Sequence, residues 1–234
     1  GQAVGRISAE LIAPYPPGGT SDILARIAGQ KLGEAWNARV VVDNRPGASG
    51  SLGTEIAAKA TADGYTMVIG SVAPTVLNPL FYPKIAYQTL RDFTPVSLIG
   101  AAPQLIVVNP SVPAKSIKEL IALGKSSKEG LNYGGSGIGT LPHLGGEMFR
   151  VMTGANMVHV SYKGTVLAIL DLLGGRLHVV FSDMPVALPH AKGASCAPWR
   201  WPDRSHSASR RTFRPRFRPV CRSLCWITGG GCWL

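Results

Sequence analysis

Cysteine is absent from the first 190 residues, although the whole chain of 234 residues contains four. A body without thiols suits an oxidising compartment, but many cytosolic domains also lack cysteine, so this absence excludes neither setting. Long apolar runs are absent too, and no stretch approaches the roughly 20 residues that a transmembrane helix needs. The start at Gly1 shows neither the basic nor the apolar segment of a secretion signal, and we expect any such signal to have been removed or not included.

Acidic residues are scarce, with 13 against 24 basic residues and a net charge of +11. Taken alone, this balance predicts nucleic acid or an anionic membrane as a partner. The excess is local, however, because residues 191–234 hold nine basic residues and one acid, Asp203. Residues 1–190 carry a net charge of only +3, which gives little reason to expect such a partner.

Strands and helices alternate along the first 98 residues. The apolar residues 7–15 predict a strand, which is followed by a turn at 16–19 and a helix from about Ser21. A second unit repeats the order, with a strand at 39–43, a loop at 44–50, a helix at 51–60 and a further strand at 65–70. This alternation predicts an α/β fold in which helices cover both faces of a parallel sheet.

The pattern changes near residues 92–100, where a strand-like crossover at 94–99 leads to a second α/β unit. Its predicted strands are 105–108, 131–134, 157–160 and 177–181, and its predicted helices are 116–125, 140–153 and 166–173. Ser116 and Glu119 stand at the positions of a capping box. We therefore expect domain I at 1–98, domain II at 99–190 and a tail at 191–234 that has no helical or strand period and no defined fold.

Three glycine-rich turns lead into predicted helices, at residues 16–20, 46–50 and 134–140. Glycine allows close approach to the backbone, and the free N–H groups of a helix start attract anions. Any single one of these turns is explained more simply as an ordinary strand-to-helix connection than as a binding site. Two of them in different domains, both at the carboxyl ends of parallel strands, together favour an anion site.

Enzymatic readings of the same glycines fail on spacing. A dinucleotide fingerprint that begins at Gly135 needs glycine where Thr140 stands, and Lys163-Gly164-Thr165 lacks the spacing of a phosphate-binding loop. The nucleophile pattern Gly-x-Ser-x-Gly is also incomplete around Ser49 and Ser136. We expect no catalysis and no cofactor, and an α/β enzyme acting on a small organic acid remains the alternative.

Three histidines and Asp183 are candidate ligands for a metal or a cleft-bound molecule. His143 and Glu147 share a helix face at a spacing that metal sites use, but no nearby pair completes the set, so no metal is expected. His159 and His178 lie in apolar strands and are predicted to be satisfied core or edge residues. Asp183 follows an apolar strand, which is where cleft residues occur, although capping of the next turn explains it equally well.

The segment Pro14 to Asp22, which reads PYPPGGTSD, resembles the Bug family of extracytoplasmic solute receptors of tripartite tricarboxylate transporters. The resemblance continues in order through the motifs NRPGA (44–48), ADGYT (62–66), DFTPV (92–96), NYG and its glycine turn (132–140), HVSYKG (159–164) and LPH (188–190). Ser161 stands where the family usually has proline.

The resemblance implies a two-domain Venus-flytrap fold that closes on a small carboxylate, often a dicarboxylate or an amino acid. It further implies a periplasmic, monomeric receptor whose closure signals to membrane permease subunits, and a carboxylate held by main-chain N–H groups and ordered water at two helix starts. Asp22 is expected to stabilise its helix rather than to touch the ligand. The residues expected to line the cleft are Tyr15, Pro17, Gly18, Gly19, Ser71, Ser136, Gly137, Thr140, His143 and Asp183.

The tail after residue 190 departs from this family. The resemblance implies a continuation KLRALAV, and residues 195–201, back-translated in G/C-rich codons with one preceding base added, read KLRALAV. We therefore predict a frameshift within codons 188–196, which leaves domain I without its C-terminal part. The arginines and aromatic residues of the tail hint at nucleic acid, and its cysteines hint at zinc, but the spacings are poor and we expect no specific nucleic-acid partner.

Overall fold

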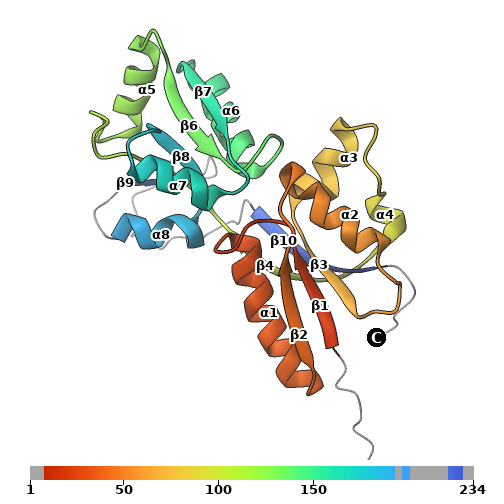
Figure 1. Cartoon of the computed structure of the whole chain (residues 1–234). Helices are drawn as coiled ribbons and strands as arrows, with labels where there is room; N and C mark the ends of the chain where they lie inside the picture. Colours follow the sequence, from red (N-terminus) through yellow and green to blue (C-terminus); the bar gives the residue numbers. More distant parts are fainter. Residues whose placement is uncertain (1–7, 193–196, 201–220, 229–234) are drawn as a thin grey trace, which may run out of the picture.

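The computed structural model describes residues 8–192, 197–200 and 221–228, which form two α/β lobes, each built on a five-stranded sheet (Figure 1). The strand order in the first lobe is β2 (Arg39–Asn44), β1 (Ser8–Ala13), β3 (Thr66–Gly70), β10 (Cys221–Thr228) and β4 (Phe93–Ala102). In the second lobe it is β7 (Met157–Ser161), β6 (Leu131–Gly135), β8 (Val179–Asp183), β5 (Gln104–Val108) and β9 (Ala197–Arg200). The two-domain fold expected from the resemblance is therefore present.

The first lobe alternates strands and helices as the sequence predicts. Leu11 of β1 packs against α1 on one face of the sheet, whereas its neighbour Ile12 packs with Ala57 of α2 on the other face, because successive strand residues point to opposite sides. The elements are β1 (Ser8–Ala13), α1 (Thr20–Trp36), β2 (Arg39–Asn44), a 3-10 turn (Ala48–Gly50), α2 (Ser51–Lys59), β3 (Thr66–Gly70), a π-helical turn (Ala73–Leu77), α3 (Asn78–Phe81), α4 (Thr89–Asp92) and β4 (Phe93–Ala102).

The second lobe follows the same principle. Phe181 of β8 packs toward Phe149 of α6, and its neighbour Val180 packs toward Ala168 of α7 on the opposite face. Ser116 accepts a hydrogen bond from the Glu119 amide at 3.2 Å, so the predicted cap of α5 is confirmed. The elements are β5 (Gln104–Val108), α5 (Ile117–Ser126), β6 (Leu131–Gly135), α6 (Leu141–Thr153), β7 (Met157–Ser161), α7 (Thr165–Leu173), β8 (Val179–Asp183) and α8 (Met184–Lys192).

Strand direction departs from a purely parallel arrangement. β5 runs antiparallel to β8, and β10 (Cys221–Thr228) runs antiparallel to β3 and β4. β4 continues to Ala102, so the strand that leads from one lobe to the other extends past the expected boundary at residue 98.

The tail also differs from the expectation at two segments. β9 (Ala197–Arg200) pairs with β5, and β10 lies between β3 and β4 in the first lobe. Extended backbone offers N–H and C=O groups whatever its side chains, and the open edge of a sheet can pair with it. The rest of the proposed frameshifted tail lies outside the described residues. Within the described part, no helix combines the length and hydrophobicity of a membrane span.

Candidate functional site

A cleft lies between the lobes at the carboxyl ends of several strands. The first lobe contributes the loop after β1, the start of α1 and the loop after β3. The second lobe contributes the starts of α6 and α7 and the end of β8. The lining residues are Tyr15, Pro16, Gly19, Thr20, Ser21, Ser71, Val72, Ala73, Ser136, Thr140, Leu141, Pro142, Gly164, Thr165, Val166 and Asp183.

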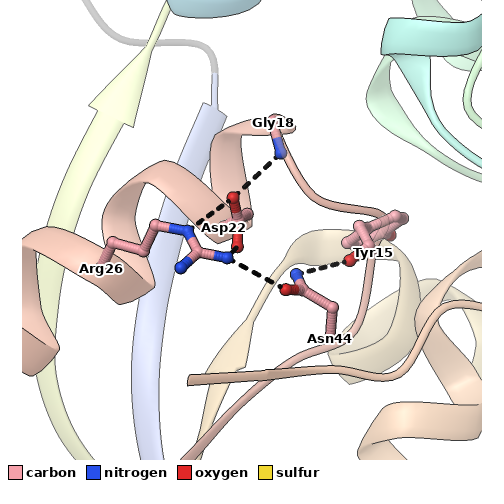
Figure 2. Close-up of polar contacts among 5 residues, drawn as sticks. All are labelled: Tyr15, Gly18, Asp22, Arg26 and Asn44. Carbon is pink, nitrogen blue, oxygen red and sulfur yellow. Dashed lines mark hydrogen bonds and ion pairs between the residues drawn. The ribbon is translucent and has the colours of Figure 1, made fainter. Parts of the chain in front are cut away.

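The first glycine turn is braced from behind by a chain of polar contacts (Figure 2). The Gly18 amide donates to Asp22 at 2.9 Å, and Arg26 donates to the same carboxylate at 3.0 Å. Arg26 also reaches Asn44, whose side-chain amide donates to the Tyr15 carbonyl at 3.1 Å. The turn is thus tied at both ends to α1 and β2, which holds the start of α1 toward the cleft.

Asp22 is buried, and its role in the first turn of α1 agrees with the expectation. Burial alone would raise the pKa of this carboxyl, but the hydrogen bonds from Arg26 and from the Gly18 amide hold it below its usual value. Asp22 therefore carries its charge behind the loop and does not line the cleft.

Three helix starts meet at the cleft, one more than the sequence analysis expected. α1 begins after Gly19, α6 after Thr140 and α7 after Gly164, and no side chain caps any of the three. By contrast, α5, which begins away from the cleft, is capped by its own Ser116. Uncapped helix starts carry partial positive charge and unpaired N–H groups, so their convergence favours an anion.

Three largely buried residues with hydroxyl groups accompany these helix starts. Ser21, Ser136 and Thr165 are 6%, 7% and 8% exposed, and all three line the cleft. Among the residues that the structure describes, their hydroxyls have no hydrogen-bond partner. Because these residues line the cleft, their hydroxyls can donate hydrogen bonds to a polar ligand there.

Asp183 connects the two lobes. Its carboxylate accepts a hydrogen bond from the Thr20 hydroxyl at 2.6 Å and another from the Gln104 side chain. Burial raises the pKa of Asp183, and these two hydrogen bonds oppose the rise. Among the described residues that line the cleft, Asp183 has the one carboxyl group. The same lining contains no lysine or arginine, so no cation there offsets the charge of Asp183.

A histidine pair lies behind the glycine-rich turn at residues 134–140. The ring centroids of His143 and His159 are 4.5 Å apart, and Nδ1 of His143 accepts a hydrogen bond from the Gly139 amide at 3.3 Å. Burial lowers the pKa of both rings, and that of His159 falls to about 4. His178 accepts from the Asn132 amide, as expected of a satisfied residue, whereas Nε2 of His159 is buried without a partner in the described part, contrary to the expectation.

The structure separates the expected site residues into two groups. Tyr15, Gly19, Ser71, Ser136, Thr140 and Asp183 line the cleft. Pro17, Gly18, Gly137 and His143 lie outside the lining, and Gly137 borders a second groove between the lobes. The sequence analysis missed Gly164 and Thr165, because Lys163-Gly164-Thr165 was compared only with a phosphate-binding loop and not with a plain helix start after a strand.

The histidine pair is not part of a larger cluster of metal-ligating side chains in the part of the chain that the structure describes. No group of three histidine, cysteine, aspartate or glutamate side chains is close enough there to hold a metal ion. The polar part of the cleft lining consists of backbone groups, hydroxyls and the Asp183 carboxyl group.

Two α/β lobes that share an interlobe cleft define the class of two-lobed binding proteins. The sequence pattern of the tripartite tricarboxylate transporter family receptor matches residues 24–195, and the chain belongs to this family. It is 37% identical over 187 residues to Protein BugT of Bordetella pertussis, a match that covers 80% of this chain and 57% of that protein.

Solved structures agree with this assignment. The chain is 33% identical to R. palustris Rpa4515, whose structure was determined with adipate, with a TM-score of 0.85 over 95% of this chain and 77% of that one. MatC of Rhodopseudomonas palustris, with bound malate, shares the fold at 21% identity and a TM-score of 0.80, over 94% of this chain and 78% of that one. The chain spans little more than half the length of the curated relatives that it matches.

Proposed function

We propose that this chain is the ligand-capturing part of a solute receptor that holds a small organic carboxylate between its lobes. The observation that carries the proposal is the convergence of three uncapped helix starts on one cleft. A carboxylate there accepts hydrogen bonds from backbone amides and from the hydroxyls of Ser21, Ser136 and Thr165, without needing a buried cation. The adipate in the structure of the 33% identical relative supports this ligand class.

Capture without catalysis fits the chemistry of the lining residues. Asp183 is the one ionisable acid or base among them apart from the phenol of Tyr15, and its contacts go to Thr20 and Gln104 rather than to a nucleophile. An α/β enzyme that acts on a small organic acid is the alternative. Proton nuclear magnetic resonance of each bound acid after prolonged incubation distinguishes the two, because an enzyme converts its ligand and a receptor returns it unchanged.

The receptor reading includes a location and a partner. The matched family is a transporter receptor, and two structural relatives are a periplasmic transporter and a periplasmic binding protein, which supports a location in the periplasm. The proposed receptor is a monomer that delivers its ligand to membrane permease subunits. Because closure brings groups from both lobes onto one ligand, the closed form presents a surface that the open form lacks, and a permease can distinguish the two forms.

A thermal-shift screen tests the ligand class. The panel contains acetate, malate, succinate, adipate, citrate, aspartate and glutamate. Each is added at about 100 times the dissociation constant expected for a micromolar receptor. Binding to the folded state alone then stabilises by about 2.7 kcal/mol, which raises the melting temperature by roughly 5–10 °C. Methyl adipate diesters are the control, since they keep the carbon chain and lose the charge.

Two outcomes contradict the proposal. Equal stabilisation by adipate and its diester would show that charge is not recognised. Salt-dependent DNA binding that persists after truncation at His190 would point to a nucleic-acid-binding body, because the basic excess lies in residues 191–234 and the body carries a net charge of only +3.

A further inference from the structure

The loop Gly47–Gly50 has an unusual backbone. All four residues have positive φ angles, of 147°, 46°, 54° and 90°, and two of them, Ala48 and Ser49, are not glycine. Side chains other than glycine rarely adopt this left-handed region, and such positions persist only where the surroundings hold them. A loop with this backbone must therefore be held in place by contacts with its surroundings.

The loop is held by Tyr15 and Asn78 of the same lobe. The Tyr15 hydroxyl donates to the Ser49 carbonyl at 3.0 Å, and Tyr15 itself lines the cleft. The Asn78 side-chain amide donates to the Ser51 hydroxyl at 2.7 Å and reaches the Ala48 carbonyl at 3.4 Å. These contacts over-determine the strained backbone and link it to the wall of the ligand site.

The same conformation directs Ser49 toward the second lobe, at the second groove. The Ser49 hydroxyl donates to the Ile138 carbonyl at 2.7 Å. Gly137 makes room for it, because a Cβ atom at Gly137 would lie 2.6 Å from the Ser49 oxygen. On the other side of the contact, a Cβ atom at Gly139 would lie 3.3 Å from Oδ1 of Asn78. Ile138 and Gly139 immediately precede the start of α6, which lines the cleft.

We infer that the hydrogen bond from Ser49 to Ile138 is a latch between the lobes that positions the α6 start and slows ligand release. This inference rests on the proposed function for its ligand, but the contact itself joins the lobes whether or not a ligand is present. Ser49 acts as a positioning residue, because it touches the loop that carries the amides and does not line the ligand cleft itself.

The variant Ser49→Gly separates the latch from the fold. Glycine adopts the positive φ of position 49 without strain, so the melting temperature of the ligand-free chain should stay the same or rise. Loss of the hydroxyl should weaken adipate binding about threefold, through faster release, because a solvent-exposed hydrogen bond contributes at the low end of the usual range. Ser126→Ala is the matched control, since it removes a hydroxyl that donates to Leu123 inside the second lobe.

A double-mutant cycle tests whether the effect crosses the lobes. Gly137→Ala places a methyl group against the Ser49 oxygen and also strains a backbone with a φ of 71°, so it should weaken adipate binding by tenfold or more. Combining it with Ser49→Gly removes the obstacle, so the double variant should bind better than Gly137→Ala alone. Additive losses would contradict a direct contact between these positions.

Hydrogen exchange of the full chain without ligand makes the test independent of carboxylate binding. Ser49→Gly should speed amide exchange at residues 136–140, while Ser126→Ala should leave that segment unchanged. If no carboxylate binds but this difference appears, the latch stands and the proposed ligand fails. If adipate binds with wild-type affinity and exchange at 136–140 is unchanged in Ser49→Gly, the latch is overturned.

Discussion

At the scale of single residues, Asp183 is the group whose charge matters most to the cleft. It is an acid in a site that we propose for another acid, and burial raises its pKa above the ordinary value of 3.8. Its folded form therefore binds a proton more tightly than its unfolded form does. Stability that depends on this proton is present below pH 3.8 and is lost as the pH rises through the raised pKa.

Asp183→Asn keeps an acceptor for Gln104 and removes the charge. We expect its melting temperature to exceed that of the wild type by a few degrees at pH 7, and the gain to shrink as the pH falls toward 3.8. Affinity for adipate should increase, because a negative charge has left the cleft. Calorimetry and melting curves across pH measure both, with the exposed Asp63→Asn as control. A loss of affinity would instead indicate a ligand with an ammonium group that pairs with Asp183.

His159 gives a second prediction at this scale. Burial, and then the neighbouring charge of His143, lower its pKa to about 4. The unfolded state therefore takes up a proton near pH 6.5 that the folded state refuses until about pH 4, so stability falls as the pH drops through this window. His159→Phe keeps a ring against Tyr133 and should flatten the decline. His190→Gln, on α8, is the control, and an unchanged pH profile in His159→Phe would refute the assignment.

At the scale of elements, the cleft depends on helices that are left uncapped. A helix start that faces solvent or a loop gains stability from a capping side chain, as α5 does from Ser116. The starts of α1, α6 and α7 have no such cap and open into the cleft. Unpaired amides at these helix starts lower the stability of the protein without ligand, and a bound carboxylate supplies the missing hydrogen-bond acceptors.

Gly19→Ser should convert this arrangement into an ordinary cap. The new hydroxyl can accept from the first amides of α1, so stability should stay equal or rise by a few tenths of a kcal/mol. Adipate affinity should fall about tenfold, because the amides are already partnered. Ser116→Ala should show the reverse, with stability lower by about 1 kcal/mol and affinity unchanged. A Gly19→Ser variant with full affinity would mean that the α1 amides do not hold the ligand.

At the scale of the whole molecule, closure rests on contacts between the lobes around the cleft. Thr20 meets Asp183, Ser49 meets Ile138, and Pro16 lies against Gly164. The last contact allows no side chain, since a Cβ atom at Gly164 would lie 2.8 Å from Pro16 Cδ. The φ angle of Gly164 is −169°, which any residue adopts.

Gly164→Ala should therefore act as a steric wedge without backbone strain. We expect a larger radius of gyration in small-angle X-ray scattering and at least a tenfold loss of adipate affinity, while each lobe keeps its fold. Gly174→Ala is the matched control, because its Cβ atom would lie 3.5 Å from the Leu170 carbonyl within the same lobe. Scattering and affinity equal to those of the wild type would show that the lobes do not close on this contact.

The DNA sequence of the gene tests whether the tail results from a frameshift. The family match ends at Ser195, close to the point where composition changes, which supports the frameshift hypothesis without testing it. Resequencing codons 188–196 decides it, and an intact reading frame there would refute it. The backbone pairing of β10 with β3 and β4 shows that the first lobe accepts a strand at this place from residues 221–228.

Local signals in the sequence were enough to predict the two-lobed α/β fold and the family. They were also enough to predict that the starts of α1 and α6 lie at the cleft. Glycine turns and helix starts are encoded within a few residues, so they can be recognised without the rest of the chain. Asp22, which the sequence analysis assigned to its own helix, is likewise a short-range feature, since its contacts reach Gly18 and Arg26 four positions away on either side.

Tertiary structure alone decided which of these loops face one another. Thr20 and Asp183 are 163 positions apart and Ser49 and Ile138 are 89 apart, and nothing in either local pattern indicates its partner. The same holds for Gly164, whose role as a third helix start depends on α7 lying beside the cleft, and for His143, which lies under its loop against His159. These contacts depend on how the two sheets and their helices pack. Each segment alone could make many different contacts, and tertiary packing selects which of them form.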